Sequence, residues 1–250
     1  MKRKLLWAVG LVLTFVLMLL VTAPATLLTR TASQFVPALA FSGVQGSFWR
    51  GEAALLRFGD STIEQLQWQL SPWRLLLGQA AVRFEFGAGT AQQGSGALLA
   101  SLSGAISASD VSVQLPAQAL QPLVRMPGVG FAGDLQLQLA DLAYADGRIE
   151  RLQGRLIWQQ AQVRTPLGQP RLGAYAVDLG GDGEGGINGD ITDIDGVLGL
   201  NGRFHVNANG LELEGSVRSD LPEELDRFFR VIGRPDGDRY SIRWQQSFAR

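Results

Sequence analysis

The sequence predicts a mainly β protein, in which a single N-terminal transmembrane helix precedes an antiparallel β-sheet domain with two short helices. Three observations predict this fold class. A charge-free apolar stretch follows a basic head. Apolar and polar residues alternate along many later segments, and clusters of glycine, aspartate and asparagine separate those segments.

The composition excludes several functional classes. The chain has 250 residues, is 46% hydrophobic and 18% charged, and carries a formal net charge of −1. Beyond Lys2, Arg3 and Lys4 there are 19 arginines against 23 acids, a net charge of about −4, so no broad basic surface for nucleic acid is expected. The lack of cysteine excludes disulfides, thiolate metal sites and a cysteine nucleophile.

Residues 5–23 carry no charge and are long enough to span a membrane. As a helix they would extend roughly 28 Å, close to the thickness of the hydrocarbon core. Lys2, Arg3 and Lys4 precede this span, so the positive-inside rule places residues 1–4 in the cytoplasm. We therefore expect a single-pass inner-membrane protein with the bulk of its chain in the periplasm of a Gram-negative cell.

A cleaved signal peptide is the alternative, because Ala23-Pro24-Ala25 resembles a cleavage site. However, the apolar stretch exceeds the usual core of about 7–15 residues, and Pro24 would lie at or beside the cut. An uncleaved anchor over residues 5–23 is favoured. A linker over residues 24–39 and a periplasmic β domain over residues 40–250 would follow it.

Alternation of apolar and polar residues predicts strands with one buried face. The clearest runs are Leu66–Leu70, Val82–Phe86, Val111–Leu115, Leu135–Leu139 and Leu211–Glu214. Turn residues separate the runs at Gly87–Gly96, Asp146-Gly147, Gly180–Gly189 and Asp236-Gly237. The exported part is therefore expected to be mostly antiparallel sheet.

Two short helices interrupt this pattern. The first is predicted over Pro116–Val124. The second begins at a cap formed by Ser219 or Asp220, carries Pro222 in its first turn, and ends at Gly233. Its apolar stripe, which we expect to cover the end of a sheet core, consists of Leu221, Leu225, Phe228, Phe229 and Ile232.

A weak internal repeat suggests a duplication. Ile63-Glu64-Gln65-Leu66 recurs 86 residues later as Ile149-Glu150-Arg151-Leu152. Two similar β units over residues 40–125 and 127–218, followed by a helix and strand over residues 219–250, are one interpretation. Chance similarity between amphipathic strands is the other.

The sequence offers no convincing catalytic, cofactor-binding or metal-binding residues. The only histidine, His205, lies in a predicted strand, and Ser71 precedes Pro72 without the context of a nucleophile elbow. The acidic stretch 178–196 has oxygen ligands of the kind that calcium prefers, but it fits no known loop spacing. We interpret it as a solvated hairpin turn and expect a protein that is not an enzyme and needs no cofactor.

The exported part contains five tryptophans, spread over strand contexts. Packing in the core or on a sheet face is the simpler interpretation, and a face that binds a partner is the functional one. They are Trp49, Trp68, Trp73, Trp158 and Trp244.

Two segments go beyond generic β patterning. They are Gly46-Ser47-Phe48-Trp49-Arg50-Gly51-Glu52-Ala53 and Leu66-Gln67-Trp68-Gln69-Leu70-Ser71-Pro72-Trp73-Arg74-Leu75-Leu76-Leu77-Gly78. Behind a single anchor, they resemble the type II secretion system protein N family (general secretion pathway protein N). Gly154–Ala161 and Leu221–Gly237 resemble later elements of that family, whereas Phe48 stands where a smaller apolar residue is expected.

The resemblance implies a non-enzymatic, inner-membrane-anchored periplasmic component of the machine that exports folded proteins through an outer-membrane secretin. The partners it implies are the secretin and the inner-membrane platform proteins. A looser similarity to AsmA-like proteins implies a curled sheet, whose apolar groove could carry lipid. We therefore hold a scaffold that accepts partner strands at its sheet edges as the first hypothesis, and a β-groove protein for lipid or another hydrophobic ligand as the alternative.

Overall fold

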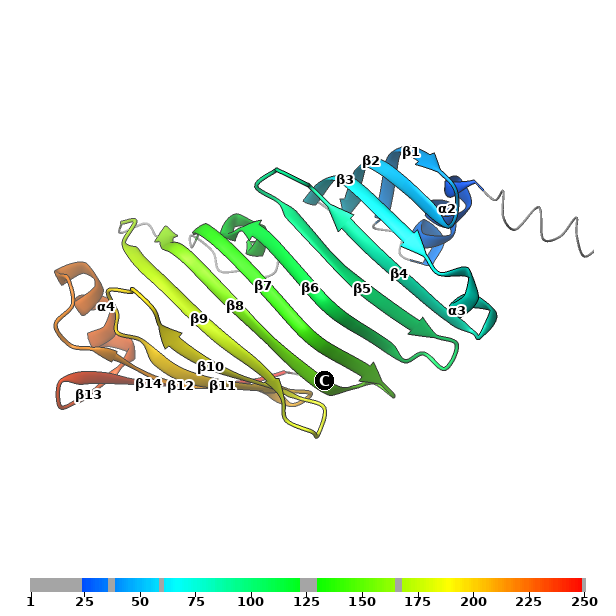
Figure 1. Cartoon of the computed structure of the whole chain (residues 1–250). Coiled ribbons are helices and arrows are strands. Elements are labelled where there is room, and N and C mark those ends of the chain that lie inside the picture. Colours follow the sequence, from blue (N-terminus) through cyan, green and yellow to red (C-terminus); the bar gives the residue numbers. More distant parts are fainter. Residues whose placement is uncertain (1–23, 36–38, 59–60, 122–129, 165–167, 249–250) are drawn as a thin grey trace, which may run out of the picture. The chain divides into compact units, whose positions relative to one another are not determined.

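A computed structural model describes residues 24–35, 39–58, 61–121, 130–164 and 168–248 (Figure 1). The membrane span predicted over residues 5–23 lies outside these ranges. Among the described residues, no helix has both the length and the apolar character needed to cross a membrane.

The chain divides into two compact units, with the boundary between Ala88 and Gly89. The strands pair with antiparallel neighbours in both units. The prediction of a mainly β protein with antiparallel sheet is therefore confirmed.

The first unit contains a four-stranded sheet in the order β1-β2-β3-β4. Its elements are α2 (Ala25–Phe35), β1 (Leu39–Gly46), β2 (Arg50–Phe58), β3 (Ser61–Leu70), α3 (Pro72–Leu76) and β4 (Gln79–Phe86). The register separates two faces. One row across the sheet is polar, with Gln45, Glu52, Gln67 and Glu85, and the neighbouring row is apolar, with Gly46, Gly51, Trp68 and Phe84.

The core of the first unit lies on this apolar face, against the start of α2. Ala25, Ala53, Trp68 and Leu70 are buried together. The indole nitrogen of Trp68 donates a hydrogen bond to the carbonyl oxygen of Phe48 at 3.3 Å, so the one polar atom of this large side chain has a partner.

The second unit contains ten strands in the order β5-β6-β7-β8-β9-β10-β11-β12-β14-β13, and β13 does not pair back to β5. Its strands are β5 (Gln93–Ser101), β6 (Ile106–Pro116), β7 (Gly130–Ala145), β8 (Arg148–Arg164), β9 (Arg171–Gly181), β10 (Ile187–Asp193), β11 (Asn201–Asn207), β12 (Gly210–Arg218), β13 (Arg234–Asp236) and β14 (Arg239–Ser247). Its helices are the 3₁₀ turn η1 (Ala117–Leu120) and α4 (Glu223–Ile232).

Directly opposed residues show how the second sheet is sided. One row is apolar across nine strands, and it consists of Gly94, Val113, Leu137, Leu156, Val177, Ile191, Gly202, Gly215 and Ile242. The row on one side of it carries Ser, Gln, Arg, Asp and Glu across the same strands. Alternation therefore places the apolar row on one face, although β-bulges shift the register within β5–β9, and Ile157 and Ala176 lie opposite each other in the row on its other side.

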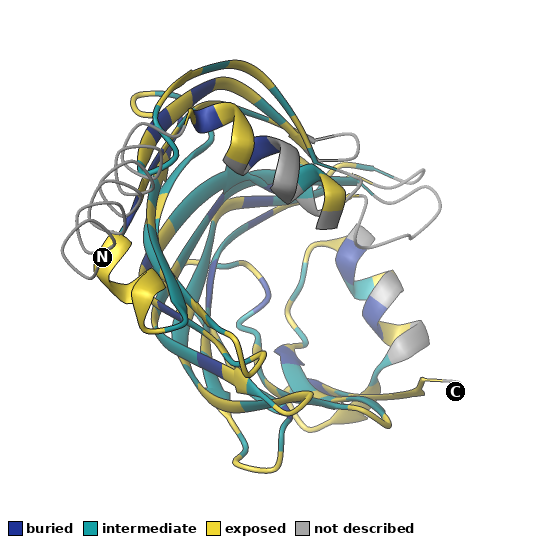
Figure 2. Cartoon of the chain, turned by 90° about the vertical axis from the view of Figure 1, so that its right-hand side faces the viewer, coloured by how far each residue is buried: buried dark blue, intermediate teal, exposed yellow. Residues whose placement is uncertain are grey.

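The buried core of the second unit occupies only part of that face. Leu225 and Phe229 of α4 pack with Val217, Tyr240 and Tyr175. In Figure 2, α4 lies on the inner side of the bent strands and carries buried segments. Arg239 donates to the carbonyl oxygens of Gly199 and Ser216, which ties the loop before β11 to this core.

The predicted helices are found with altered ends. η1 covers the start of the segment predicted over Pro116–Val124, and residues 122–124 lie outside the described ranges. The predicted cap of the second helix is wrong, because α4 begins at Glu223 after an N-cap at Pro222. Ser219 donates instead to the carbonyl oxygen of Asp238, and the carboxylate of Asp220 pairs with Arg218. Gly233 ends the helix as predicted.

The structure adds to two predictions, the linker over residues 24–39 and the internal duplication. α2 lies within residues 24–39, where we expected only a linker. The repeated tetrapeptides at Ile63 and Ile149 both lie near the start of the second strand of a hairpin, in β3 and β8. The duplication over residues 40–125 and 127–218 stays a prediction.

Candidate interaction surfaces

His205 lies in a closed polar cluster on β11. Its Nδ1 lies 2.8 Å from Asn188 Oδ1, and its Nε2 lies 3.0 Å from Asn207 Nδ2. Nε2 also lies 3.7 Å from Asp182 Oδ2, so the ring has polar neighbours on both sides. Both ring nitrogens are engaged in structural hydrogen bonds, which suits a residue that joins β10 to β11.

The acidic stretch over residues 178–196 forms the β9–β10 hairpin and the loop after it. Asp182 Oδ1 accepts hydrogen bonds from the backbone nitrogens of Glu184 and Gly186, and these bonds lower the pKa of its carboxyl group. Asp193 likewise accepts from Gly196 and Leu200. These carboxylates therefore hold turns, and across the described residues no group of acids and His205 is arranged to bind a metal ion.

The tryptophans divide into two groups. Trp68 is buried, and Trp49 and Trp158 pack against the two cores. Trp73 is 77% exposed and Trp244 is 48% exposed. Ser71, the other candidate residue, is the N-cap of α3, and its backbone nitrogen donates to the carbonyl oxygen of Ala81.

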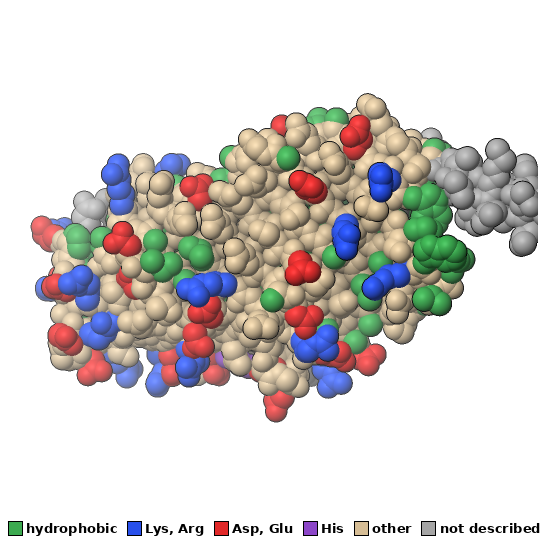
Figure 3. All heavy atoms as spheres, in the orientation of Figure 1, with side chains coloured by type: hydrophobic (Ala, Val, Ile, Leu, Met, Phe, Trp, Pro, Cys, Tyr) green, Lys and Arg blue, Asp and Glu red, His purple; other side chains and the backbone are tan. Residues whose placement is uncertain are grey.

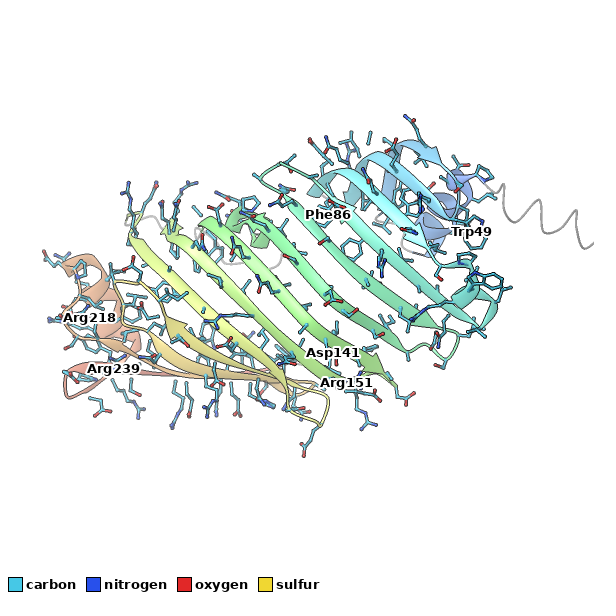
Figure 4. All side chains as sticks on the ribbon, in the orientation of Figure 1. Trp49, Phe86, Asp141, Arg151, Arg218 and Arg239 are labelled. Atoms are coloured by element: carbon cyan, nitrogen blue, oxygen red, sulfur yellow. The ribbon has the colours of Figure 1, made fainter. Side chains whose placement is uncertain are left out.

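The polar face of the second sheet carries ion pairs between neighbouring strands. Arg151 and Asp141, which belong to β8 and β7 and lie close together in Figure 4, are joined by a hydrogen bond of 2.7 Å. A second row runs from Arg155 through Asp178, Asp190, Arg203 and Glu214 to Arg243 across six strands. We call this row the charge ladder.

The apolar face of the second sheet is only partly covered. η1 contacts β7, and the buried cluster of α4 extends to Tyr175 of β9, but this cluster includes no described residue of β5–β7. On this face Val111 and Leu135 are buried and Leu137 and Leu156 are half-buried, whereas Leu98, and Ile106 and Tyr144 at the ends of β6 and β7, are exposed. Large side chains on an uncovered face indicate a surface for an apolar ligand or partner.

The outer edge of β14 is unpaired along much of its length. β13 pairs with β14 only as far as Ser241, whereas β12 pairs with it as far as Ser247. No described residue pairs with the outer edge from Ile242 to Ser247. Asp236 and Arg239 are the pair next to the turn of the β13–β14 hairpin, so the N–H and C=O groups of Arg239 point toward β13. Because the backbone groups of every second residue point to the same edge of a strand, those of Arg243, Gln245 and Ser247 also point to this outer edge.

Comparisons with known proteins decide the family. The family model described as type II secretion system (T2SS), protein N, matches residues 37–243. The chain belongs to this family. Membership makes it a component of the type II secretion system, as the two motif segments in β2–β3 and α3 indicated.

Two relatives carry the same name as the family. A type II secretion system protein N from Aeromonas hydrophila is 29% identical over 98% of this chain and 99% of its own length. A type II secretion system protein N from Vibrio cholerae serotype O1 is 31% identical over 72% of this chain and 71% of its own length. No solved structure matches this member of the protein N family.

Sequence reasoning missed the outer edge of β14, and it also missed the exposed turn at α3, where Trp73, Leu76 and Leu77 are 77%, 74% and 78% exposed. The outer edge of β14 has no signal in the sequence, because pairing partners are set by topology. The exposed side chains of α3 did have one, since Leu75-Leu76-Leu77 interrupts the alternation between two amphipathic strands.

Proposed function

We propose that this protein N family member is a non-enzymatic scaffold or accessory of the type II secretion system, anchored in the inner membrane with its bulk in the periplasm. It acts by protein–protein contact during export of folded proteins through the outer-membrane secretin. Family membership supports a role in type II secretion. The basic residues before residues 5–23 support an inner-membrane anchor with the bulk of the chain in the periplasm. The unpaired edge of β14 supports action through protein–protein contact.

The edge of β14 is the observation that carries the proposed mode of action. An unpaired strand edge offers a row of backbone donors and acceptors to an extended segment of another protein. Arg243, Gln245 and Ser247 present these groups outward. Trp244 is 48% exposed on the opposite side of the strand and would add an apolar contact to the backbone hydrogen bonds.

The partners we propose are the secretin and the inner-membrane platform proteins. Either could supply an extended segment within the periplasm. The edge has no row of like charges, because Arg243 pairs with Glu214 at 2.8 Å and Gln245 and Gln246 follow it. Recognition through backbone groups suits such a neutral edge.

Substitution of Gln245 by proline tests this contact. Proline removes the outward N–H group without disturbing a hydrogen bond to β12. Gln245→Ala is the matched control, because it removes the same side chain and keeps the N–H group. We expect Gln245→Pro to reduce secretion and co-purification with secretin or platform subunits, and Gln245→Ala to behave as wild type. A folded Gln245→Pro variant that secretes as wild type would contradict the proposed contact.

The topology has a separate test, which uses the absence of native cysteine. A cysteine introduced at the exposed Ala208 should react with a membrane-impermeant maleimide in spheroplasts. The mass of the membrane-extracted chain should include residues 1–23. Protection of this cysteine in spheroplasts, or loss of the first 23 residues, would contradict the anchored periplasmic topology.

A β-groove protein that binds lipid or another hydrophobic ligand is the second candidate function. The partly covered apolar face of the second sheet, over β5–β7, favours it. Mass spectrometry on detergent-free protein should then find bound phospholipid. Leu137→Asp on the apolar face should abolish this binding, and Gln138→Asp on the polar face should preserve it. Absence of lipid from the wild-type protein would leave the scaffold as the only candidate.

A further inference from the structure

The first unit carries a surface that its fold leaves exposed. Trp73, Leu76 and Leu77 are 77%, 74% and 78% exposed, and no residue of α3 is buried. Figure 3 shows hydrophobic side chains gathered at the end of the first unit where α2 and α3 lie. Exposure of three large apolar residues within one short turn is costly in water, and it indicates a binding surface.

The backbone presents these side chains in a fixed position. Ser71 N donates to Ala81 O at 2.9 Å, and Gly78 N donates to Leu75 O at 3.0 Å. Gly78 has a φ of 74°, which allows the chain to turn directly into β4. The apolar residues therefore belong to an ordered turn between β3 and β4.

Three arginines border the same end of the sheet. Arg50 of β2 and Arg83 of β4 both lie opposite Gln69 of β3, and Arg74 belongs to α3 itself. All three are exposed, and none forms an ion pair with a carboxylate of the described residues. An apolar group with a basic border matches the interface of a bilayer that contains anionic lipid.

The chain enters the first unit at this same end. Pro24 forms a bridge with Ser47, in the turn between β1 and β2. Leu70, just before α3, donates from its backbone nitrogen to Trp49 O in that turn at 2.7 Å. The predicted membrane span ends at residue 23, so it delivers the chain to the end of the sheet that holds α3.

We infer that Trp73, Leu76 and Leu77, with Arg50, Arg74 and Arg83, form a membrane-docking patch. The occupant of this α3 patch is the surface of an anionic phospholipid bilayer. The inference rests on the anchor of the proposed function. The anchor and α3 together make two attachments at one end of the first unit, which would orient its sheet relative to the membrane.

Spin labelling tests the α3 patch in the full chain. A nitroxide is attached to a single introduced cysteine at Leu76, or at the control position Thr62 at the opposite end of β3. The proteins are reconstituted into vesicles of phosphatidylethanolamine and phosphatidylglycerol. We expect the ratio of oxygen to nickel-chelate accessibility to be several-fold higher at position 76 than at position 62.

The possible results of the spin-labelling experiment distinguish failure of the α3 patch from failure of the membrane anchor. Protein that stays in the vesicles after an alkaline carbonate wash, with a water-like ratio at position 76, would overturn the α3 patch and leave the anchor intact. Low accessibility to both reagents at position 76 would indicate a protein contact and also overturn it. Release by carbonate would overturn the anchor and the α3 patch together.

A separate variant tests the three arginines that border the α3 patch. Combined Arg50→Glu, Arg74→Glu and Arg83→Glu should lower the ratio at position 76 to the value at position 62. Arg57→Glu, an exposed arginine nearer the other end of β2, should leave the ratio unchanged. An unchanged ratio in the triple variant would show that anionic lipid does not hold the patch.

Discussion

The indole ring of Trp68 lies over Gly51, its direct partner across the β2–β3 pair. A Cβ atom at Gly51 would lie only 2.5 Å from Trp68 Cζ2 and 2.9 Å from the carbonyl oxygen of Gln45. The glycine and the tryptophan belong to the two segments that first suggested the family. Their spacing reflects a packing requirement, because the ring can cover the sheet only where its partner has no side chain.

This packing predicts that Gly51→Ala destabilises the first unit. The ring of Trp68 must move, and its hydrogen bond to Phe48 O is strained, at a cost of about 1–3 kcal/mol in the free energy of unfolding. Urea denaturation followed by tryptophan fluorescence measures the loss. Gly180→Ala in β9 is the control, because a Cβ atom there meets nothing within 4 Å. Equal midpoints for both variants would contradict the account of the Gly51–Trp68 pair.

The attachment of α4 is predicted to depend on pH. Tyr240 donates to Asp226 Oδ1 at 2.8 Å, and this bond, with Arg230, holds the pKa of Asp226 below 3.8. A lowered pKa in the folded state contributes stability above pH 3.8, and this contribution is lost as the pH falls through the folded value. Tyr240→Phe should therefore unfold at lower urea than wild type at neutral pH. The gap should narrow below pH 3.8, and a constant gap would argue against the coupling.

The charge ladder predicts a salt-dependent contribution from Arg203. Asp178 and Asp190 face each other across β9 and β10, and Arg203 Nε lies 2.8 Å from Asp190 Oδ1. Arg203→Gln leaves two like charges opposite each other, which should lower the thermal midpoint at low ionic strength. Asp190→Asn in the same chain should restore it. A loss that persists in high salt would show that Arg203 stabilises the sheet through something other than charge.

The sequence predicts the clearest strands well, because each of these strands has one polar and one apolar face. Leu135, Leu137 and Leu139 alternate with glutamines, and the register places them together on the apolar face. The turn at Asp146-Gly147 is equally clear, since both residues have positive φ values, of 52° and 78°. Local rules therefore suffice where the structure repeats every two residues.

Other features depend on contacts that no local pattern reveals. Ser219 and Asp220 have the chemistry of helix caps, but Asp238 and Arg218 compete for them, so α4 begins later. The apolar alternation of β5–β9 looks the same whether or not a second layer covers it. For the same reason, the unpaired edge of β14 could be found only from the fold, whereas the run Leu75-Leu76-Leu77 carried a sequence signal for the exposed side chains of α3.

The most direct test of the account asks what lies against the edge of β14 in a cell. The chain has no cysteine, so one introduced at Gln245 reports on that edge alone, and Gln138 on the polar face of β7 provides the control. In cells that assemble the secretion system, the cysteine at position 245 should crosslink to the secretin or to a platform protein, and the cysteine at position 138 should not. Failure of position 245 to crosslink to any secretion subunit in actively secreting cells would contradict the proposed scaffold.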